Sequence, residues 1–318
     1  MGEHGNQLMA LNQALTSASS ISVQFWGVRG SIACPGSTTL RYGGNTPCVE
    51  IRCGPYTLIF DAGTGIRPLG NALTQSANGT GFDIFLSHGH IDHVIGLPFF
   101  APLFMEDQTV RVWAGSLEPA GGVEKAVRKL MSFPFFPLQV DALHAELEFH
   151  DFRAGDVINP RPGVTLRTAA LNHPGGAIGY RIEYGEQSVA YVTDIELGDG
   201  PIDPALLALT KDAAILILDT TYTDEELPAH VGWGHSSWQQ GIRLADACGA
   251  GRLCLFHHDP EHDDEFLDRI EKLCRERFSN TVLAREGMEI EIGEAPGTMP
   301  RSPGRLSRRT RLTSSARK

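Results

Sequence analysis

The 318-residue sequence predicts a layered α/β fold in which two β-sheets are covered by helices. Short apolar runs of strand length alternate with glycine-rich turns. Strand-like runs dominate the early and late parts of the chain, and helical segments are interposed between them. With 42% hydrophobic and 20% charged residues, the composition is that of an ordinary globular protein. It excludes a disordered, collagen-like or coiled-coil chain.

The elements follow from the apolar pattern and from the turns that bound each run. Because functional side chains concentrate on loops held by a scaffold, we expect them just after the strands. Helices are predicted over 120–131, 236–248 and 261–276. Strands are predicted over 21–26, 46–52, 56–60, 83–87, 110–114, 147–152, 164–171, 178–184, 188–193, 213–218, 252–256 and 288–293.

The chain divides into three parts by composition. Residues 1–20 are small and polar and are expected to form a flexible N-terminal arm. Residues 21–293 contain no linker or low-complexity stretch and are expected to form a single domain. Residues 294–318 are rich in Pro, Gly, Ser and Arg, which predicts a basic, disordered C-terminal tail.

The compartment is predicted from what the sequence lacks. No apolar run approaches the roughly 20 residues needed to span a bilayer. The N-terminus lacks the basic start and apolar stretch of a secretory signal. Six scattered cysteines, none of them in a CxxC pair, are typical of structural thiols in a reducing compartment. We therefore expect a cytoplasmic protein with no membrane partner.

The charge is unevenly distributed. Residues 301–318 hold seven basic residues and no acidic one, which leaves 20 basic against 38 acidic residues in the rest of the chain. Nucleic-acid affinity depends largely on basic side chains that neutralise phosphates. The acidic body therefore disfavours nucleic acid as a partner without excluding it, and it is compatible with a small anionic substrate held by metal ions.

The strongest indication of function is SHGHIDH, which begins at the end of the predicted strand 83–87. On a turn, the alternate side chains His88 and His90 can bind one metal ion. Asp92 and His93 then point to a second position nearby. Neutral imidazoles and carboxylates are typical zinc ligands. A solvated polar loop is the plainer interpretation, but it does not explain three histidines and an aspartate within six residues.

A two-metal site needs further ligands from distant parts of the chain. His173, Asp194 and His257 each follow an apolar predicted strand. Taken singly, each is ambiguous, because a polar residue at a strand end is common. Together, and in this order after SHGHIDH, they form a candidate ligand set.

These residues carry a resemblance to a known family. SHGHIDH is followed in order by NHPGGAIGYRIE, AYVTDIE, GHSSW and LFHHDP. This ordered set resembles the metallo-β-lactamase superfamily, most of all the branch of tRNase Z and the small cyclic-phosphodiester hydrolases. FWGVRGSIACPG, RYGGNTPCVEI and LIFDAGTGI also resemble the first half of that fold. The resemblance covers residues 21–293 and implies an αββα sandwich of two mixed sheets flanked by helices.

The resemblance also implies a division of the ligands between two divalent metal ions. It assigns one metal to His88, His90 and His173, the other to Asp92, His93 and His257, and a bridging position to Asp194. His258 is the rival to His257, which directly follows its strand. Asp61 matches a carboxylate that supports a ligating histidine from behind. Zinc is the expected metal, and manganese or iron would suit the same ligands.

His235 in GHSSW matches a histidine that lies beside the metals without binding them. Phosphodiester hydrolysis expels an alkoxide, and a nearby imidazole can protonate it as general acid. The alternative is a histidine at a helix start, with Ser236 or Ser237 as the cap. Asp92 and His235 are the candidate catalytic residues.

The resemblance implies a binuclear hydrolase in which two ions share a water and lower its pKa. We predict a phosphodiesterase that acts on small or cyclic phosphodiesters. Alternatives are a thioesterase or lactonase of the same superfamily, a tRNA 3′-end processing endonuclease, and a non-catalytic metal module that senses a nucleotide. His90 argues against a diiron redox centre, which would carry an HxExD pattern. Asp194 argues against a true β-lactamase, several of which carry cysteine there.

Two further expectations concern substrate and assembly. Arg29, Arg41 and Asn45 lie in glycine-rich loops and are candidate contacts to a substrate phosphate, because arginine offers planar paired donors. A plain solvated role is the alternative. A second copy of the chain is a candidate partner, because members of this family often pair.

Overall fold

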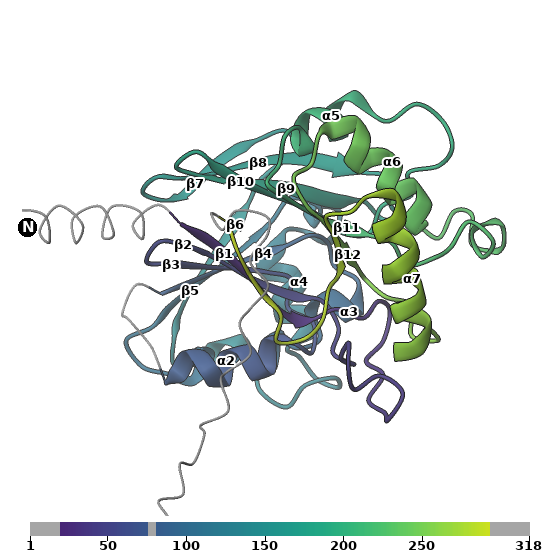
Figure 1. The fold of residues 1–318 in the computed structure, drawn as a ribbon. Coiled ribbons are helices and arrows are strands. Elements are labelled where there is room, and N and C mark those ends of the chain that lie inside the picture. Colours follow the sequence, from purple (N-terminus) through teal and green to yellow (C-terminus); the bar gives the residue numbers. More distant parts are fainter. Residues whose placement is uncertain (1–19, 76–80, 293–318) are drawn as a thin grey trace, which may run out of the picture.

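Two seven-stranded β-sheets stack face to face at the centre of the molecule (Figure 1). The computed structural model describes residues 20–75 and 81–292. The predicted tail and all but the last residue of the predicted arm therefore lie outside the described residues.

The first sheet is built from the first half of the chain and closed by its last strand. β3 to β6 run parallel to one another, whereas β14, β1, β2 and β3 pair antiparallel. In spatial order the strands are β14 (Glu289–Glu291), β1 (Ile21–Gly27), β2 (Cys48–Cys53), β3 (Tyr56–Phe60), β4 (Phe82–Leu86), β5 (Thr109–Ala114) and β6 (Glu146–Asp151).

The second sheet repeats this mixed arrangement. β10 to β13 are parallel, and β7 to β10 pair antiparallel. In spatial order the strands are β13 (Thr281–Leu283), β12 (Leu253–Phe256), β11 (Ile215–Asp219), β10 (Gln187–Val192), β9 (Ala177–Tyr184), β8 (Val164–Leu171) and β7 (Val157–Arg161).

Helices cover the outer face of each sheet, and the result confirms the predicted αββα class (Figure 1). α2 (Ile66–Thr74) and α4 (Val123–Leu130) pack on the first sheet. α5 (Pro204–Thr210), α6 (Trp238–Cys248) and α7 (Asp264–Arg277) pack on the second. None of the described helices is long and apolar enough to cross a bilayer. Short helices complete the described chain: α3 (Ile91–Val94), η1 (Leu97–Phe99), η2 (Ala101–Phe104), η3 (Glu118–Ala120), η4 (Val140–Ala142) and η5 (Leu227–Ala229).

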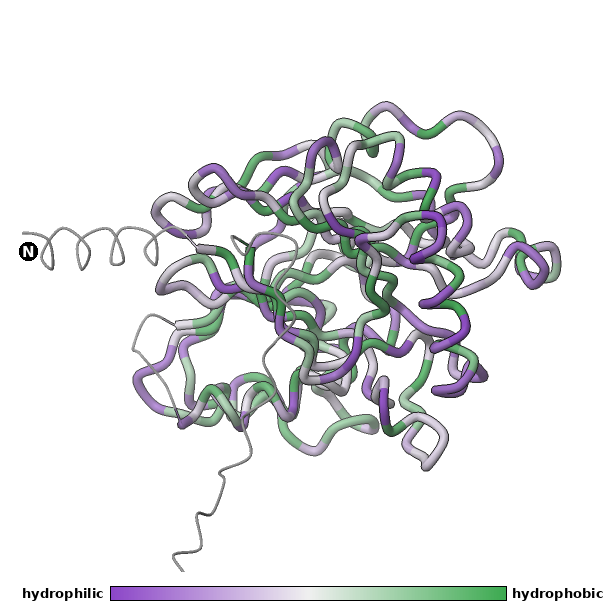
Figure 2. The backbone as a smooth tube through the Cα atoms, in the orientation of Figure 1, coloured by the Kyte–Doolittle hydropathy of each residue, from purple (hydrophilic) through white to green (hydrophobic). Residues whose placement is uncertain are grey.

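An aromatic cluster joins the two sheets. The Phe60 ring centroid lies 5.3 Å from that of Phe85 in its own sheet, and 5.4 and 5.5 Å from those of Tyr180 and Tyr191 in the other. All four side chains are buried, and burying a side chain such as Phe60 stabilises the fold by about 1.5–3 kcal/mol. Figure 2 shows the same pattern, with hydrophobic stretches along the central strands and hydrophilic ones on many outer loops.

The predicted elements are mostly present, and the missed ones have local causes. α6 and α7 begin later than predicted because Ser237 and Asp263 cap their first turns with side-chain oxygens. α2 was missed because it contains a proline and a glycine, which weaken a helical pattern. β7 also contains a proline, and β13 has only three residues.

Candidate metal centre

The SHGHIDH motif bridges the end of β4 and the short helix α3. His90 is extended and stands just before the first turn of α3. Asp92 and His93 therefore lie on that turn and are buried, whereas His88 is buried in the loop before it. The three histidines converge because a strand end, a tight loop and a helix start follow within a few residues.

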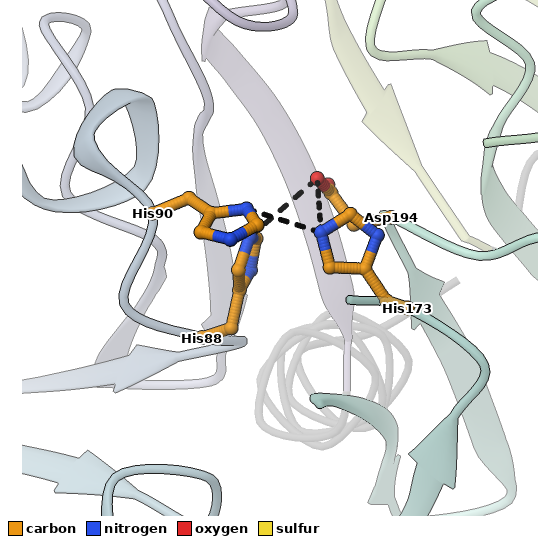
Figure 3. Close-up of side chains that lie close together, drawn as sticks. All are labelled: His88, His90, His173 and Asp194. Carbon is orange, nitrogen blue, oxygen red and sulfur yellow. Dashed lines mark hydrogen bonds and ion pairs between the residues drawn. The ribbon is translucent and has the colours of Figure 1, made fainter. Parts of the chain in front are cut away.

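One group of possible metal ligands joins this loop to the second sheet (Figure 3). His88, His90, His173 and Asp194 each offer one donor atom, and these atoms lie within 4.8 Å of one another. His90 Nδ1 is 3.1 Å from His173 Nε2. Asp194 Oδ2 is 3.6 Å from His88 Nε2 and 3.7 Å from His173 Nε2.

A second group lies directly beside the first. Asp92, His93 and His257 offer donor atoms within the same limit. The Nε2 atoms of His93 and His257 are 3.3 Å apart. Asp92 Oδ2 lies 3.2 Å from the first of these nitrogens and 3.4 Å from the second.

Asp194 connects the two groups through its two carboxylate oxygens. Whereas Oδ2 faces the first group, Oδ1 lies 3.2 Å from His93 Nε2 and 3.4 Å from His257 Nε2. Donor atoms around a tetrahedral zinc ion, with bonds of about 2.0–2.1 Å, lie about 3.3 Å apart. The spacing of these donors thus fits two metal ions that share one carboxylate.

His88 provides an independent test of this fit. Its Nε2 atom is buried and makes no hydrogen bond to any other described residue. Burial lowers the pKa of His88 well below its usual range, so its ring is neutral. A buried neutral nitrogen without a hydrogen-bond partner is costly unless a ligand such as a metal ion completes it.

The carboxylates in the centre are anionic. Burial raises the pKa of Asp92 and of Asp194, but the neighbouring histidines outweigh it and hold both carboxyls well below their usual range. Two anionic carboxylates among imidazoles form a donor set suited to divalent transition metals.

The backbone at the centre adopts uncommon conformations. Asp61, Asp194 and His257 follow β3, β10 and β12 with φ values of 61°, 54° and 63°. For residues other than glycine, the left-handed region is sparsely populated and costs of order 1–3 kcal/mol. At each position the chain turns sharply at the strand end, and the three side chains belong to one cluster.

Asp61 supports His93 from behind. Its Oδ2 atom lies 2.8 Å from His93 Nδ1 and accepts the Tyr191 hydroxyl at 2.7 Å, while Oδ1 accepts the Ser87 backbone N–H at 2.7 Å. Such a contact fixes the orientation of the imidazole, so that Nε2 faces the other donors. Tyr191 was not predicted, since a buried tyrosine in a strand carries no local sequence pattern for this role.

A second carboxylate behind the centre was also missed. Asp219, the last residue of β11, lies 2.8 Å from His235 Nδ1 through Oδ2 and accepts the Thr221 hydroxyl at 2.7 Å through Oδ1. Thr221 in turn lies 3.1 Å from Nδ1 of His257. The available signal was a carboxylate closing an apolar strand, the same feature that identified Asp194.

His235 lies at the edge of the cluster. It forms a third close group with Asp194 and His257, and its ring stacks on that of His257 with centroids 4.9 Å apart. Burial lowers its pKa, but Asp219, Asp194 and Asp92 outweigh burial and raise the pKa of His235 to about 9. The cap of the following helix α6 is Ser237, one of the two predicted candidates, and it forms a capping box with Gln240.

His257 and His258 lie in different surroundings. The His258 ring is buried away from the cluster, with Nε2 2.8 Å from the carbonyl oxygen of Ala284 and its edge toward Tyr42. Burial and nearby Arg29 lower its pKa to about 3. Of the two rivals, His257 is the one brought to the other donors.

Arg29 does not meet the expectation of a substrate contact. It is fully buried, and its guanidinium donates to the backbone carbonyls of Gly43, Asp259 and His262 at 2.6–3.0 Å. Those bonds tie two loops together and hold the side chain in the interior, where Nη2 has no hydrogen-bond partner among the described residues.

Arg41 and Asn45 are likewise engaged in structural contacts. Arg41 forms ion pairs with Asp264 and Asp268 at α7. The Asn45 amide donates to Glu286 at 2.9 Å and accepts the Thr64 hydroxyl at 2.9 Å. Carboxylates and a hydroxyl thus contact the polar groups of both residues, and their substrate-binding role stays a prediction.

Comparison with known proteins agrees with this fold. A model of the β-lactamase superfamily domain matches residues 56–258. The chain belongs to this superfamily, in its metallo-β-lactamase form, and is a metal-dependent hydrolase.

Individual relatives are distant but cover most of the chain. A Ribonuclease Z from Myxococcus xanthus is 25% identical over 298 residues, which cover 78% of this chain and 92% of that protein. The metallo-β-lactamase fold protein YhfI from Bacillus subtilis superposes with a TM-score of 0.63 at 19% identity, covering 86% and 99% of the two chains. Human tRNase Z, short form, gives a TM-score of 0.59 at 19% identity and covers 85% and 98%. The two structural likenesses support the fold alone.

Proposed function

We propose that this protein hydrolyses phosphodiesters at a binuclear metal centre, and that its substrate is an RNA, as in tRNA 3′-end processing. The observation that carries the chemistry is a histidine–carboxylate pair, His235 and Asp219, beside a donor set divided by the two oxygens of Asp194. A two-metal site activates water and holds the phosphate, and the histidine serves the leaving group.

We infer the division of the donor atoms between the two ions from the distances among them. His88, His90 and His173 would hold one ion and Asp92, His93 and His257 the other, with Asp194 shared. Zinc suits these ligands best, and manganese or iron would also bind them. When bound, the ions supply a water of lowered pKa and neutralise charge on the phosphate.

His235 would deliver the proton that the leaving oxygen needs. Because Nδ1 is held by Asp219, Nε2 remains available for proton transfer. The carboxylate stabilises the imidazolium form, so a proton is present at neutral pH, and the imidazole takes up a new proton from solvent after each turnover. Asp219 therefore acts as a positioning residue for His235.

The choice of RNA rests on the relatives. Several curated relatives, from bacteria and archaea, carry the name Ribonuclease Z. This favours the endonuclease alternative over the small or cyclic phosphodiester that the sequence led us to expect. The small diester is kept as a second candidate because of the charge: outside residues 301–318 the chain has 20 basic against 38 acidic residues.

The decisive experiment compares leaving groups. Metal-loaded wild-type protein and His235→Gln would be assayed on precursor tRNA, on cyclic nucleotides and on bis(p-nitrophenyl) phosphate. An alkoxide needs protonation, whereas a nitrophenolate leaves as a stable anion. We expect His235→Gln to lose about 10²–10⁴-fold on alkoxide-releasing substrates and far less on the nitrophenyl ester.

The same assay separates the candidates. Cleavage of precursor tRNA supports the endonuclease, whereas turnover of cyclic nucleotides alone supports the small-diester candidate. No turnover of any diester by protein shown to hold two metals would overturn the proposal. Thioesters and lactones would then be assayed.

A further inference from the structure

The loop between β11 and α6 carries an exposed tryptophan next to the metal centre. The Gly234 carbonyl lies 2.9 Å from His173 Nδ1, and Gly234 has a φ of 86° with no room for a side chain, since a Cβ atom would lie 2.2 Å from the His173 ring. Trp233 therefore immediately precedes the residue that contacts a candidate ligand. Its side chain is 59% exposed, which is costly for so large an apolar group.

The backbone that presents Trp233 is braced. One carboxylate oxygen of Glu196 accepts the N–H groups of both Gly232 and Gly234, at 2.8 and 3.1 Å. The Trp233 N–H donates to the His230 carbonyl at 3.0 Å. An exposed side chain on a loop held at several points is preorganised for contact and loses little entropy on binding.

A row of rings runs from the candidate general acid to this tryptophan. The Tyr222 ring centroid lies 6.0 Å from that of His235 and 4.2 Å from that of His230, on which it stacks at 13°. The His230 ring meets Trp233 edge to face at 4.9 Å. The row ends at the exposed indole, so a further planar group could continue it.

The charge of this loop argues against a role in binding phosphate. From residue 212 to 242 the sequence has no lysine or arginine, and Asp224, Glu225 and Glu226 lie in the loop. An acidic loop repels a phosphate, but an indole face accepts any nucleobase. Phe133 and Phe135 are more exposed than Trp233, but among the described residues neither takes part in a ring contact with the donor cluster.

We propose that Trp233 is a stacking platform for a nucleobase of the substrate beside the scissile phosphate. This inference rests on the proposed function. It supplies a contact to the bases of the substrate, since the acidic chain offers few basic side chains for its phosphates. Stacking of one base contributes affinity irrespective of sequence, as expected when phosphate contacts are few.

The test separates the contribution of the bases to affinity from that of the phosphates. Metal-loaded protein would be titrated with a phosphorothioate-linked oligoadenylate, which resists cleavage, and with an abasic oligomer of the same length and charge. We expect the base-bearing oligomer to bind roughly 5- to 150-fold more tightly, with Trp233→Ala abolishing that preference and Trp233→Phe keeping most of it. Val231→Ala is the matched control, because Val231 is 70% exposed on the same loop but has no π face.

Fluorescence gives a second readout that needs no turnover. Of the four tryptophans, Trp26 and Trp113 are partly buried and Trp238 is buried, so stacking should quench Trp233 selectively. If Trp233→Ala weakened binding of both oligomers equally, the platform would be overturned. An unchanged preference of Trp233→Ala for the base-bearing oligomer would also overturn it. If Trp233→Ala changed the sedimentation coefficient of the protein but not its affinity for the oligomers, the indole would be a contact between copies of the chain. That result would also overturn the platform. If base-dependent quenching persists but no diester is cleaved, the proposed function fails and the platform stands.

Discussion

His93 and His257 bring their Nε2 atoms to 3.3 Å from each other across 164 positions of sequence. One belongs to the helix start after β4 in the first sheet, and the other follows β12 in the second. Two imidazole nitrogens at this distance, with Asp92 and Asp194 oxygens at 3.2–3.4 Å, are spaced as ligands of one ion. The centre therefore depends on how the two sheets stack.

Replacing the shared carboxylate should remove both metals and activity together. In Asp194→Ala we expect metal content to fall clearly below that of the wild type. We also expect kcat to fall by at least about 10³-fold, because the metal ions activate the water and bind the phosphate. Elemental analysis and a diesterase assay measure the two quantities. Glu186→Ala, in an exposed turn, is the control. Full metal content in Asp194→Ala would contradict the bridging assignment.

Asp61→Asn should weaken metal binding without removing a ligand. The amide keeps the shape but loses the charge that orients His93, and such changes typically cost 10–100-fold in metal affinity. Competition with a chromophoric chelator measures this. Asp83→Asn offers a matched control, because Asp83 is also fully buried but bonds Arg161 and Trp113 instead. Equal affinity losses in both variants would indicate general destabilisation.

Asp219→Asn should move the pH profile in a defined direction. The Asp219 charge helps to raise the pKa of His235 to about 9, so its removal lowers that pKa. A general acid works only while protonated, and activity falls as pH rises through its pKa. The alkaline limb of kcat should therefore shift to lower pH, with metal content retained. A shift to higher pH would contradict the assigned role of His235.

Metal removal should destabilise the fold. The cluster gathers imidazoles and carboxylates, most of them buried, and the buried His88 Nε2 has no hydrogen-bond partner among the described residues. At free metal 100-fold above its Kd, binding to the native state alone contributes about 2.7 kcal/mol. Differential scanning calorimetry should show a lower Tm after chelation, restored by zinc. An unchanged Tm would mean that the native state holds no metal under those conditions.

Arg29 should prove structural. Arg29→Met leaves three backbone carbonyls unpaired in the interior and should lower the free energy of unfolding by about 2–4 kcal/mol. Urea denaturation measures this. Arg41→Ala, with an exposed ion pair, should unfold almost as the wild type does. When both variants are assayed at a low temperature at which they are folded, KM should equal that of the wild type. A large rise in KM for Arg29→Met would instead indicate that Arg29 takes part in substrate binding.

The fold class, most strands, three helices and the candidate ligands could all be predicted from the sequence. Local patterns carry this information: alternating burial in β1, apolar runs in β4 and β11, and polar residues at strand ends. His173 and Asp194 could be found because each follows an apolar strand, where a scaffold commonly holds functional side chains.

Which polar groups meet could not be predicted from local patterns, because it depends on the tertiary packing. His257 and His258 are chemically identical neighbours, and a left-handed turn at His257 directs one ring to the donors while the other faces Ala284. Arg29 occurs in a glycine-rich loop typical of ligand binding, yet the packing of two loops buries it. The contact of Asp219 with His235 depends on where α6 starts relative to β11. Side-chain partners follow from backbone direction and from the stacking of the sheets, and neither is written in a local pattern.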